Sequence, residues 1–370
     1  MRIGIPRESK PGERRVALLS EAVAALVGAG HEVRVATGAG SGAGEPDAAY
    51  VTAGARVVDA DAAWQADLVV KVKEIQPGEH DRLAPGSTLF CFQHLVGEPE
   101  LARALASRGV TAIAFEMVRD GAGGFPILAP MSALAGRLAI QAGAHHLTVP
   151  GGGRGVLLAG GPGSEPARVL VLGGGHAGAN AAEVAAALGA SVTLLTRSEA
   201  TRDALWARFD GRVALDLATP ENLEAEVPAA DLVVGAVFVP GAPTPRLLPR
   251  GLVARMRPGS VIVDVSIDAG GVAETSRPTT HDDPVFVAEG VVHYGVPNMP
   301  AAVPRAAAQA LSAVVGPCAL ALAGGVAPAL KADAGLAAGV LLWQGRATHA
   351  GIASEAALAF APLGPADFES

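Results

Sequence analysis

Residues 169–198 read VLVLGGGHAGANAAEVAAALGASVTLLTRS and decide the fold of the second half of this 370-residue chain. An apolar run leads into Gly173-x-Gly175-x-x-Gly178, an alanine-rich helical pattern and a second apolar run. In a dinucleotide-binding βαβ unit, the first glycine permits the tight turn and the second lets the pyrophosphate approach the backbone. The third glycine lets helix and strand pack closely. The stretch therefore predicts a dinucleotide site with its phosphates at the helix N-terminus.

The end of the second apolar run departs from the usual pattern. An acidic residue is expected about 20 residues after the turn, where it holds the ribose 2′-hydroxyl. Here the chain has Thr196, Arg197 and Ser198. An acid would repel a 2′-phosphate, whereas two hydroxyls and a guanidinium bind one. We therefore expect NADP(H) in preference to NAD(H); the alternative is that Arg197 points to solvent and NAD binds through other contacts.

The composition excludes several classes of protein. The net charge is -8 and the pI is about 5.6, whereas nucleic-acid binders carry a basic surface. The length favours two domains. Cys91 and Cys318 have neither disulfide nor metal-ligand spacing, which favours free buried thiols, no metal site and a reducing, cytoplasmic setting. The charged N-terminus is unlike a signal peptide.

One uncharged segment, residues 306–330, is long enough for a membrane span, which needs about 20 apolar residues. It consists mostly of Ala, Gly and Val, and Gly316-Pro317 and Gly324-Gly325 interrupt it. We therefore expect a buried helix between domains and no membrane partner.

Short apolar runs alternate with helical patterns along the whole chain. This alternation predicts α/β domains in which helices cover a mostly parallel, doubly wound sheet. The expected strands are residues 3–5, 32–36, 68–72, 88–92, 111–115, 232–236 and 261–265. The expected helices are residues 20–29, 99–107 and 130–146, and residues 150–166 are expected to form a loop.

Four polar residues stand where packing explains them poorly. Lys73, His94 and Asp268 lie at or just beyond the ends of apolar runs, and Arg15 lies in the charged segment GERRVAL. Sites of α/β proteins assemble at the carboxyl ends of strands. Hydride transfer to or from a nicotinamide needs a substrate clamp and a proton donor or acceptor. Taken singly, each residue also fits a solvated strand end or a structural role.

Ten sequence blocks, spread over both halves, carry a resemblance to a known family. In chain order they are RIGIPRESKPGERRVAL, VVKVKE, FQHL, LAPMSALAGRLA, GGRGVLL, VLGGGHAG, DLVVGAVFVPG, VDVSIDAGG, SRPTT and VPNMPAAVP. With these blocks in this order, the chain resembles the alanine dehydrogenase family, which also includes the nucleotide-binding part of proton-translocating transhydrogenase.

The resemblance implies a role for individual residues. Arg15 and Lys73 would bind the substrate carboxylate, and Asn298 would lie near the substrate. His94 and Asp268 would be catalytic, with His94 as the general acid/base. The cofactor-binding residues would be Ser132, Gly173, Gly175, His176, Ala177, Gly178, Thr196, Arg197, Ser198, Val237 and Asp268.

The resemblance also implies the domain organisation and the reaction. Residues 1–126 and 305–370 would form a substrate domain, and residues 127–304 a dinucleotide-binding domain. Both would be Rossmann-like, with the active site in a cleft between them. The reaction would be the reversible oxidative deamination of an L-amino acid to a 2-oxo acid and ammonia. The partners would be these small molecules, and the assembly a homo-oligomer, with a hexamer among the options.

Departures from the family pattern keep alternatives open. Ala133 stands where a glutamate is expected, and Gln93, Val96, Gly295 and Pro297 also depart near the inferred pocket. The alternatives are a dehydrogenase for another amino acid, an imine reductase on the same scaffold, or a soluble transhydrogenase-like nucleotide-binding protein.

Overall fold

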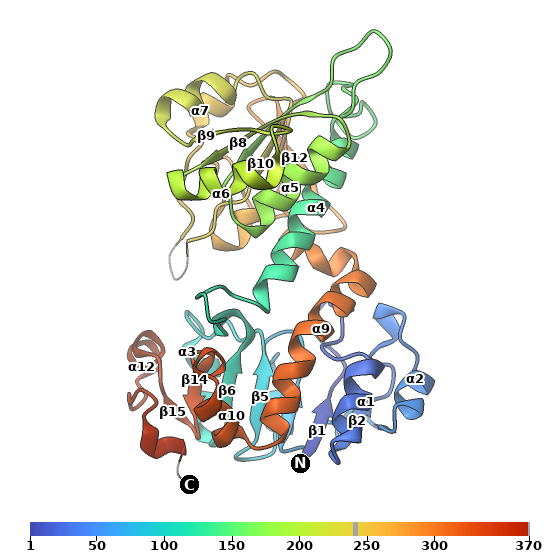
Figure 1. Ribbon diagram of the computed structural model, residues 1–370, viewed down its shortest axis with the longest axis vertical. Helices are drawn as coiled ribbons and strands as arrows, with labels where there is room; N and C mark the ends of the chain where they lie inside the picture. Colours follow the sequence, from blue (N-terminus) through green and yellow to red (C-terminus); the bar gives the residue numbers. More distant parts are fainter. Residues whose placement is uncertain (240–242, 369–370) are drawn as a thin grey trace. The chain divides into compact units, whose positions relative to one another are not determined.

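The computed structural model describes residues 1–239 and 243–368. The chain forms two compact units (Figure 1): unit 1 is Met1–Met131 with Val303–Ser370, and unit 2 is Ser132–Ala302. The boundaries expected from the sequence fall after residues 126 and 304. The first observed boundary, between Met131 and Ser132, lies inside an unbroken helix, Leu128–His146, so no linker composition marks it.

Unit 1 is built on an eight-stranded sheet in the order β15-β14-β6-β5-β4-β1-β2-β3. The strands β1 to β6 pair in parallel, and β14 and β15 add antiparallel pairs at one edge. The strands are β1 (Arg2–Ile5), β2 (Glu32–Ala36), β3 (Arg56–Val58), β4 (Leu68–Val70), β5 (Thr88–Cys91), β6 (Thr111–Ala114), β14 (Val340–Trp343) and β15 (Arg346–Ala347).

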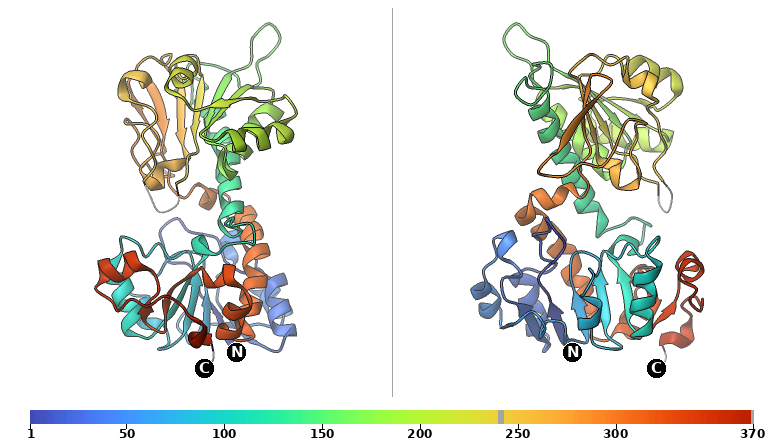
Figure 2. Two further views of the ribbon diagram at one scale, coloured as in Figure 1. Left: turned by 60° about the vertical axis from the view of Figure 1, so that its left-hand side comes forward. Right: turned by 180° about the vertical axis from the view of Figure 1, so that it is seen from behind.

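Helices cover both faces of the unit 1 sheet (Figure 2). Side chains of α3 and α12 join one core cluster with β5 and β6, while α9 packs on α1, α10 and β4. The helices are α1 (Ser20–Gly28), α2 (Asp47–Thr52), α3 (Pro99–Ser107), α9 (Pro304–Ala323), α10 (Val326–Ala332), α11 (Ala334–Ala337) and α12 (Ala350–Ala356). Helix α9 is long and apolar enough to cross a membrane by composition alone, but half of it is buried inside the protein. The segment expected as one buried helix between domains is thus two helices of unit 1, α9 and α10, separated at Gly324 and Gly325.

Unit 2 is built on a seven-stranded sheet in the order β12-β13-β11-β10-β7-β8-β9. All pairs are parallel except β12 with β13. The strands are β7 (Arg168–Leu172), β8 (Ser191–Thr196), β9 (Ala214–Leu217), β10 (Leu232–Gly235), β11 (Val261–Asp264), β12 (Val285–Ala288) and β13 (Val291–Tyr294).

Alternate residues of the unit 2 strands enter two different cores. Val169 and Val171 pack with α4, α5 and α6 on one face, whereas Leu170 and Leu172 pack with α7 and α8 on the other. This alternation is expected of a strand buried on both faces. The helices are α4 (Leu128–His146), α5 (His176–Ala187), α6 (Glu199–Phe209), α7 (Pro220–Glu226) and α8 (Arg250–Val253).

Both sheets confirm the predicted doubly wound α/β fold. In unit 1 the chain order reverses between β1 and β4, and in unit 2 between β7 and β10. Ligands of such sheets bind outside the carboxyl ends of the strands at this reversal. Several predicted strands end one or two residues early; β4, expected to reach residue 72, stops at Val70 because the next residue, Lys71, turns into a charged cluster.

Candidate active site

The loops that leave the carboxyl ends of four neighbouring strands carry the polar residues of unit 1. Arg15 follows β1, Lys73 follows β4 and His94 follows β5. Glu116 follows β6, in the 3-10 turn Phe115–Met117. Because β1, β4, β5 and β6 are adjacent and parallel, their loops gather at one edge of the sheet. Unit 1 therefore brings together Arg15, Lys73 and His94, three of the residues expected from the sequence.

Arg15 is held rigidly by a buried carboxylate two residues away. Its Nε and Nη2 atoms donate to the two oxygens of Glu13 at 2.7 and 2.6 Å, and its backbone N–H donates to the same side chain at 3.0 Å. Both side chains are almost fully buried, at 2% and 1% exposed. A bidentate pair of this kind fixes the plane of the guanidinium. Sequence reasoning selected Arg15 but missed Glu13.

Lys73 lies close to Arg15 and is only partly accessible. Burial, followed by the positive charge of Arg15, lowers the pKa of the Lys73 ammonium. Its Nζ lies 5.8 Å from the centre of the Phe92 ring, a cation–π distance. In the described part of the chain no carboxylate forms an ion pair with this ammonium. Lys73 is therefore available to a ligand carboxylate.

His94 projects from the end of β5 with an unusual backbone. Its φ is 48°, in the left-handed region that residues other than glycine rarely occupy. The ring stacks on Phe92 with centroids 6.1 Å apart and 9° between planes. About half of the side chain is exposed (53%), and its Nδ1 lies 3.9 Å from the Glu116 carboxylate. His94 and Lys73 thus meet at the same aromatic ring.

A buried charged cluster beneath these residues escaped sequence reasoning. Lys71 has no exposed side-chain surface; its Nζ lies 2.9 Å from Glu79 and 3.4 Å from Glu8. Burial lowers the pKa of Lys71, but the two carboxylates outweigh it and raise the pKa overall. The available signal was the charge at residue 71, which interrupts an otherwise apolar run.

The glycine turn of unit 2 has the geometry that a pyrophosphate requires. Gly173 has φ 108°, and a Cβ there would stand 2.3 Å from the Ala236 carbonyl oxygen. A Cβ at Gly178 would stand 1.8 Å from the Gly173 oxygen, so helix and strand pack in contact. At Gly175 no described atom lies within 4 Å of such a Cβ. The space above Gly175 therefore fits the phosphates of a dinucleotide.

Helix α5 begins at this turn, with His176 and Ala177 in its first turn. A Cβ at Gly136 of α4 would stand 1.9 Å from the Ala177 oxygen, so the two helices are in close contact there. Ser132 lies one helical turn before Gly136 on the same face of α4. The helical period thus puts Ser132 on the face of α4 whose Gly136 touches the first turn of α5.

The three residues at the end of β8 differ in what they can offer a ligand. Thr196 is buried at 4% exposed, and its Oγ1 would lie 3.1 Å from a Cβ at Gly174, beside the glycine turn. Ser198 caps α6, because its Oγ accepts the Thr201 N–H at 3.3 Å. Arg197 is exposed, and its side chain makes no hydrogen bond or ion pair with the described residues.

Two further loops complete the carboxyl edge of unit 2. Asp268 lies in the 3-10 turn Val265–Ala269, and its Oδ2 accepts the N–H of Asn298 at 3.3 Å. Ser266 both accepts the Val237 N–H at 2.8 Å and donates to its carbonyl at 2.9 Å. The loops after β10 and β11 are therefore tied together. Residues 240 and 241 of the DLVVGAVFVPG block lie outside the described residues.

The buried carboxylate Asp264 folds the loop that carries Asp268. It accepts hydrogen bonds from Ser266 N at 3.1 Å, Val272 N at 2.8 Å and Ser276 Oγ at 2.6 Å. Burial outweighs these bonds and raises the pKa of Asp264. Sequence reasoning missed Asp264 because it reads as the last residue of an apolar strand.

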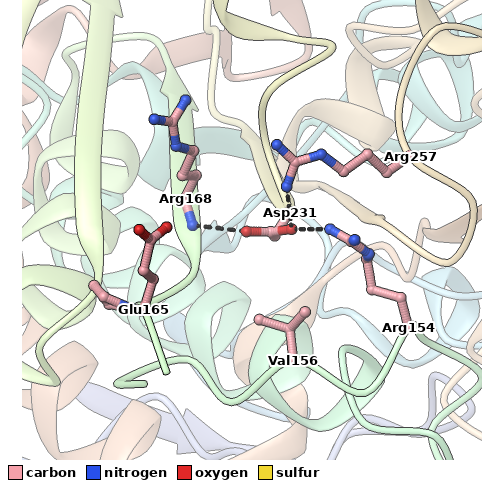
Figure 3. A pocket seen from close by; sticks show the side chains of 7 residues that line it. Arg154, Val156, Glu165, Arg168, Asp231 and Arg257 are labelled. Atoms are coloured by element: carbon pink, nitrogen blue, oxygen red, sulfur yellow. Dashed lines mark hydrogen bonds and ion pairs between the residues drawn. The ribbon is translucent and has the colours of Figure 1, made fainter. Parts of the chain in front are cut away.

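Unit 2 also has a hollow of about 350 Å³ that is a poor candidate for the cofactor site (Figure 3). Asp231 sits at its centre, with its Oδ1 2.5 Å from Arg154 and 3.4 Å from Arg257. Arg168 begins β7 and Asp231 directly precedes β10. The hollow therefore opens at the amino ends of the strands, the edge opposite to the glycine turn. Among the described residues, no group of three His, Cys, Asp or Glu side chains could hold a metal ion.

Two family models match the chain and together cover most of it. The description "Alanine dehydrogenase/PNT, N-terminal domain" matches residues 4–135. The description "Alanine dehydrogenase/PNT, C-terminal domain" matches residues 139–350.

Individual relatives agree with the family models. An alanine dehydrogenase of Halomonas elongata is 48% identical over 95% of this chain and 96% of its own length. An alanine dehydrogenase of Bacillus subtilis is 44% identical over 98% and 96%. A solved L-alanine dehydrogenase superposes with a TM-score of 0.93 at 46% identity, covering 96% of this chain and 99% of that one. A transhydrogenase from Sinorhizobium meliloti superposes with a TM-score of 0.82 at 26% identity, covering 95% and 99%.

Proposed function

This chain belongs to the alanine dehydrogenase/PNT family, and from that premise we propose that it catalyses the reversible oxidative deamination of an L-amino acid. L-Alanine is the first substrate to test, with pyruvate and ammonia as products. The enzyme is an oxidoreductase acting on a CH–NH2 group with a nicotinamide cofactor.

One observation carries this proposal: the carboxyl edge of unit 1 joins an anion receptor to a proton carrier. Arg15 and Lys73 lie close enough for the charge of Arg15 to lower the pKa of Lys73. Lys73 and His94 both contact the ring of Phe92. A protein that exchanged hydride only between nucleotides would need no such receptor. The lower identity to the transhydrogenase, 26% against 44–48%, points the same way.

The mechanism follows from what each side chain can do. Arg15 and Lys73 bind the carboxylate of the amino acid and so orient its Cα–H bond. A bound nicotinamide would supply the hydride acceptor, and the amino group must first be deprotonated so that loss of hydride from Cα gives the iminium of the substrate. His94 takes a proton from the water that attacks the iminium carbon and returns it to the nitrogen of the resulting carbinolamine. Ammonia then leaves as the hydroxyl loses its proton and becomes the carbonyl of the 2-oxo acid. Asp268, at the carboxyl edge of unit 2, keeps in this proposal the catalytic role that the family resemblance implies for it.

The residues at the end of β8 favour NADP(H) over NAD(H) in this proposal. No carboxylate ends β8, and the exposed Arg197 is not committed to another group among the described residues. A guanidinium there attracts a 2′-phosphate. Ser198 Oγ already accepts an N–H as the cap of α6. In this proposal Thr196 and Arg197 are therefore the residues that bind the 2′-phosphate.

The test is a set of rates with both nucleotides. Purified protein is assayed with alanine and other L-amino acids in one direction, and with ammonia and 2-oxo acids in the other. We expect alanine and pyruvate to be turned over, with a higher kcat/KM for NADPH than for NADH. The variant Thr196→Asp should reverse the nucleotide preference. The control Arg212→Ala, just beyond the C-terminus of α6, should leave the preference unchanged. Equal or better use of NADH by the unaltered protein contradicts the preference for NADP(H).

A further inference from the structure

A carboxylate from the neighbouring strand holds the backbone on which His94 stands. Glu116 Oε1 accepts the N–H of His94 at 2.8 Å and that of Gln93 at 3.1 Å. The same oxygen lies 3.9 Å from His94 Nδ1. A left-handed backbone such as that of His94 is strained and persists only where its surroundings impose it. Glu116 supplies the contacts that impose it.

A carboxylate in the loop after β1, the strand next to β4, holds the backbone of Lys73 in the same way. Glu8, in the loop after β1, accepts the N–H of Val72 at 2.6 Å and that of Lys73 at 3.4 Å. Its side chain is 3% exposed and is paired with Lys71. In both places a carboxylate at the end of an adjacent strand accepts hydrogen bonds from two consecutive backbone N–H groups. In both places the second of these belongs to the residue that carries the functional side chain.

This arrangement is costly, which argues against an incidental role. Burial raises the pKa of the Glu8 carboxyl, and a buried carboxylate needs partners to offset its lost hydration. Backbone N–H groups at the edge of a sheet can be satisfied by water or a neutral side chain at lower cost. A charged group is the stronger acceptor and fixes its donors more firmly.

We propose that Glu8 and Glu116 are positioning residues that set the Lys73 ammonium and the His94 ring against the two sides of one substrate. The inference rests on the proposed deamination. Phe92 lies between the two devices and contacts both side chains. Glu8 acts through Lys73, so its loss weakens binding of the substrate carboxylate. Glu116 acts through His94, so its loss slows proton transfer.

The test compares an alanine substitution at each position, with a glutamine substitution added at Glu116. Glu116→Gln keeps an oxygen where Oε1 accepts both N–H groups, whereas Glu116→Ala removes it. We expect Glu116→Ala to lower kcat roughly a hundredfold with little change in the KM for alanine, because a misplacement of about 1 Å has an effect of this size. Glu116→Gln should recover most of this loss. Glu8→Ala should instead raise the KM for alanine about tenfold, the loss expected when one charged hydrogen bond weakens.

The matched control is Glu98→Ala, an exposed residue four positions beyond His94 whose side chain makes no hydrogen bond with the described residues. Binding of NADPH, measured by protein fluorescence, should be unchanged in all five proteins, because unit 2 is not altered. If both alanine variants change kcat and KM in the same way, or if Glu116→Ala stays within about twofold of the unaltered protein, the proposal is wrong.

A second measurement separates this inference from the proposed reaction. In ¹⁵N-histidine-labelled protein, the signals of the His94 ring are assigned by their loss in His94→Gln. They should shift in Glu116→Ala and stay in place in Glu116→Gln and Glu98→Ala, with no substrate present. Unchanged signals in Glu116→Ala overturn the positioning role of Glu116. An unaltered protein that deaminates no amino acid, but shows the expected shifts, overturns the proposed function and leaves the positioning role standing.

Discussion

The two units place the same strand order beneath two different kinds of site. In each sheet, the order of the strands reverses beside the first strand of the unit, β1 or β7. Unit 2 then exposes bare backbone at Gly175, above the N-terminus of α5. Unit 1 instead fills the corresponding edge with paired charges such as Arg15 with Glu13 and Lys71 with Glu79. A phosphate that must contact the backbone needs glycine, whereas a small carboxylate needs side chains held at fixed positions.

The sharpest difference lies in the general acid/base that we propose for unit 1, the side chain of His94. His94→Gln should lower kcat by about 10²- to 10⁴-fold, the usual contribution of a general acid/base. The Kd for NADPH should stay unchanged because the dinucleotide residues lie in unit 2. Steady-state rates and a fluorescence titration measure the two quantities. Full turnover in this variant would contradict the role given to His94.

The buried charges of unit 1 should make it sensitive to the loss of a single partner. Lys71→Met leaves Glu8 and Glu79 buried without their cation, and we expect the free energy of unfolding to fall by about 3–5 kcal/mol. Urea denaturation measures this change. Adding Glu8→Gln and Glu79→Gln should recover part of the loss, because the uncompensated charges are then gone. A triple variant less stable than Lys71→Met would show that the charges are not the cause.

In the glycine turn of unit 2, one glycine substitution should affect stability and another should affect cofactor binding. Gly178→Ala places a methyl 1.8 Å from the Gly173 oxygen, so we expect a loss of about 1–3 kcal/mol of stability from overpacking. Gly175→Ala meets no described atom within 4 Å and should leave the Tm unchanged while weakening NADPH binding. Calorimetry and a binding titration distinguish the two. Equal destabilisation by both variants would contradict the space assigned to the pyrophosphate.

The smallest expected effect concerns the pH dependence of substrate binding. The pKa of Lys73 is lowered by burial and by Arg15, so its ammonium loses its proton at a lower pH than an ordinary lysine. The KM for alanine should therefore begin to rise as the pH climbs toward that lowered pKa, at a lower pH than an ordinary lysine would cause. Lys73→Arg keeps its charge throughout this range and should remove the rise. The exposed Lys331→Arg serves as control and should leave the profile as it is.

The backbone site of unit 2 and the side-chain site of unit 1 also differ in how far the sequence predicts them. The glycine turn was predictable because its requirement is local: Gly173, Gly175 and Gly178 lie within six residues and each has a backbone reason. Lys73 and His94 were also found, because strand ends can be recognised in the sequence. Glu8 and Glu116 could not be found this way. Their partners are 64 and 22 residues away, and only the pairing of adjacent strands brings them together.

Lys71 illustrates the remaining difficulty. Within LVVKVK, the strand was expected to run to residue 72, which put residue 73 at the strand end and residue 71 inside the strand. The structure ends β4 at Val70 and buries Lys71 between two carboxylates. No local pattern reveals that a lysine will be neutralised by residues from two other loops.

The pairing of charges in unit 1 has a consequence for how the substrate arrives. Arg15, Lys71 and Lys10 each face a carboxylate, namely Glu13, Glu79 and Glu74. Within each pair, the two opposite charges largely cancel each other's field at a distance. Salt in dilute buffer screens what remains beyond about 10 Å. These three pairs therefore contribute little to drawing in an amino acid, itself a zwitterion, from afar. The rate of substrate capture should depend on diffusion and fit, and it should respond little to ionic strength.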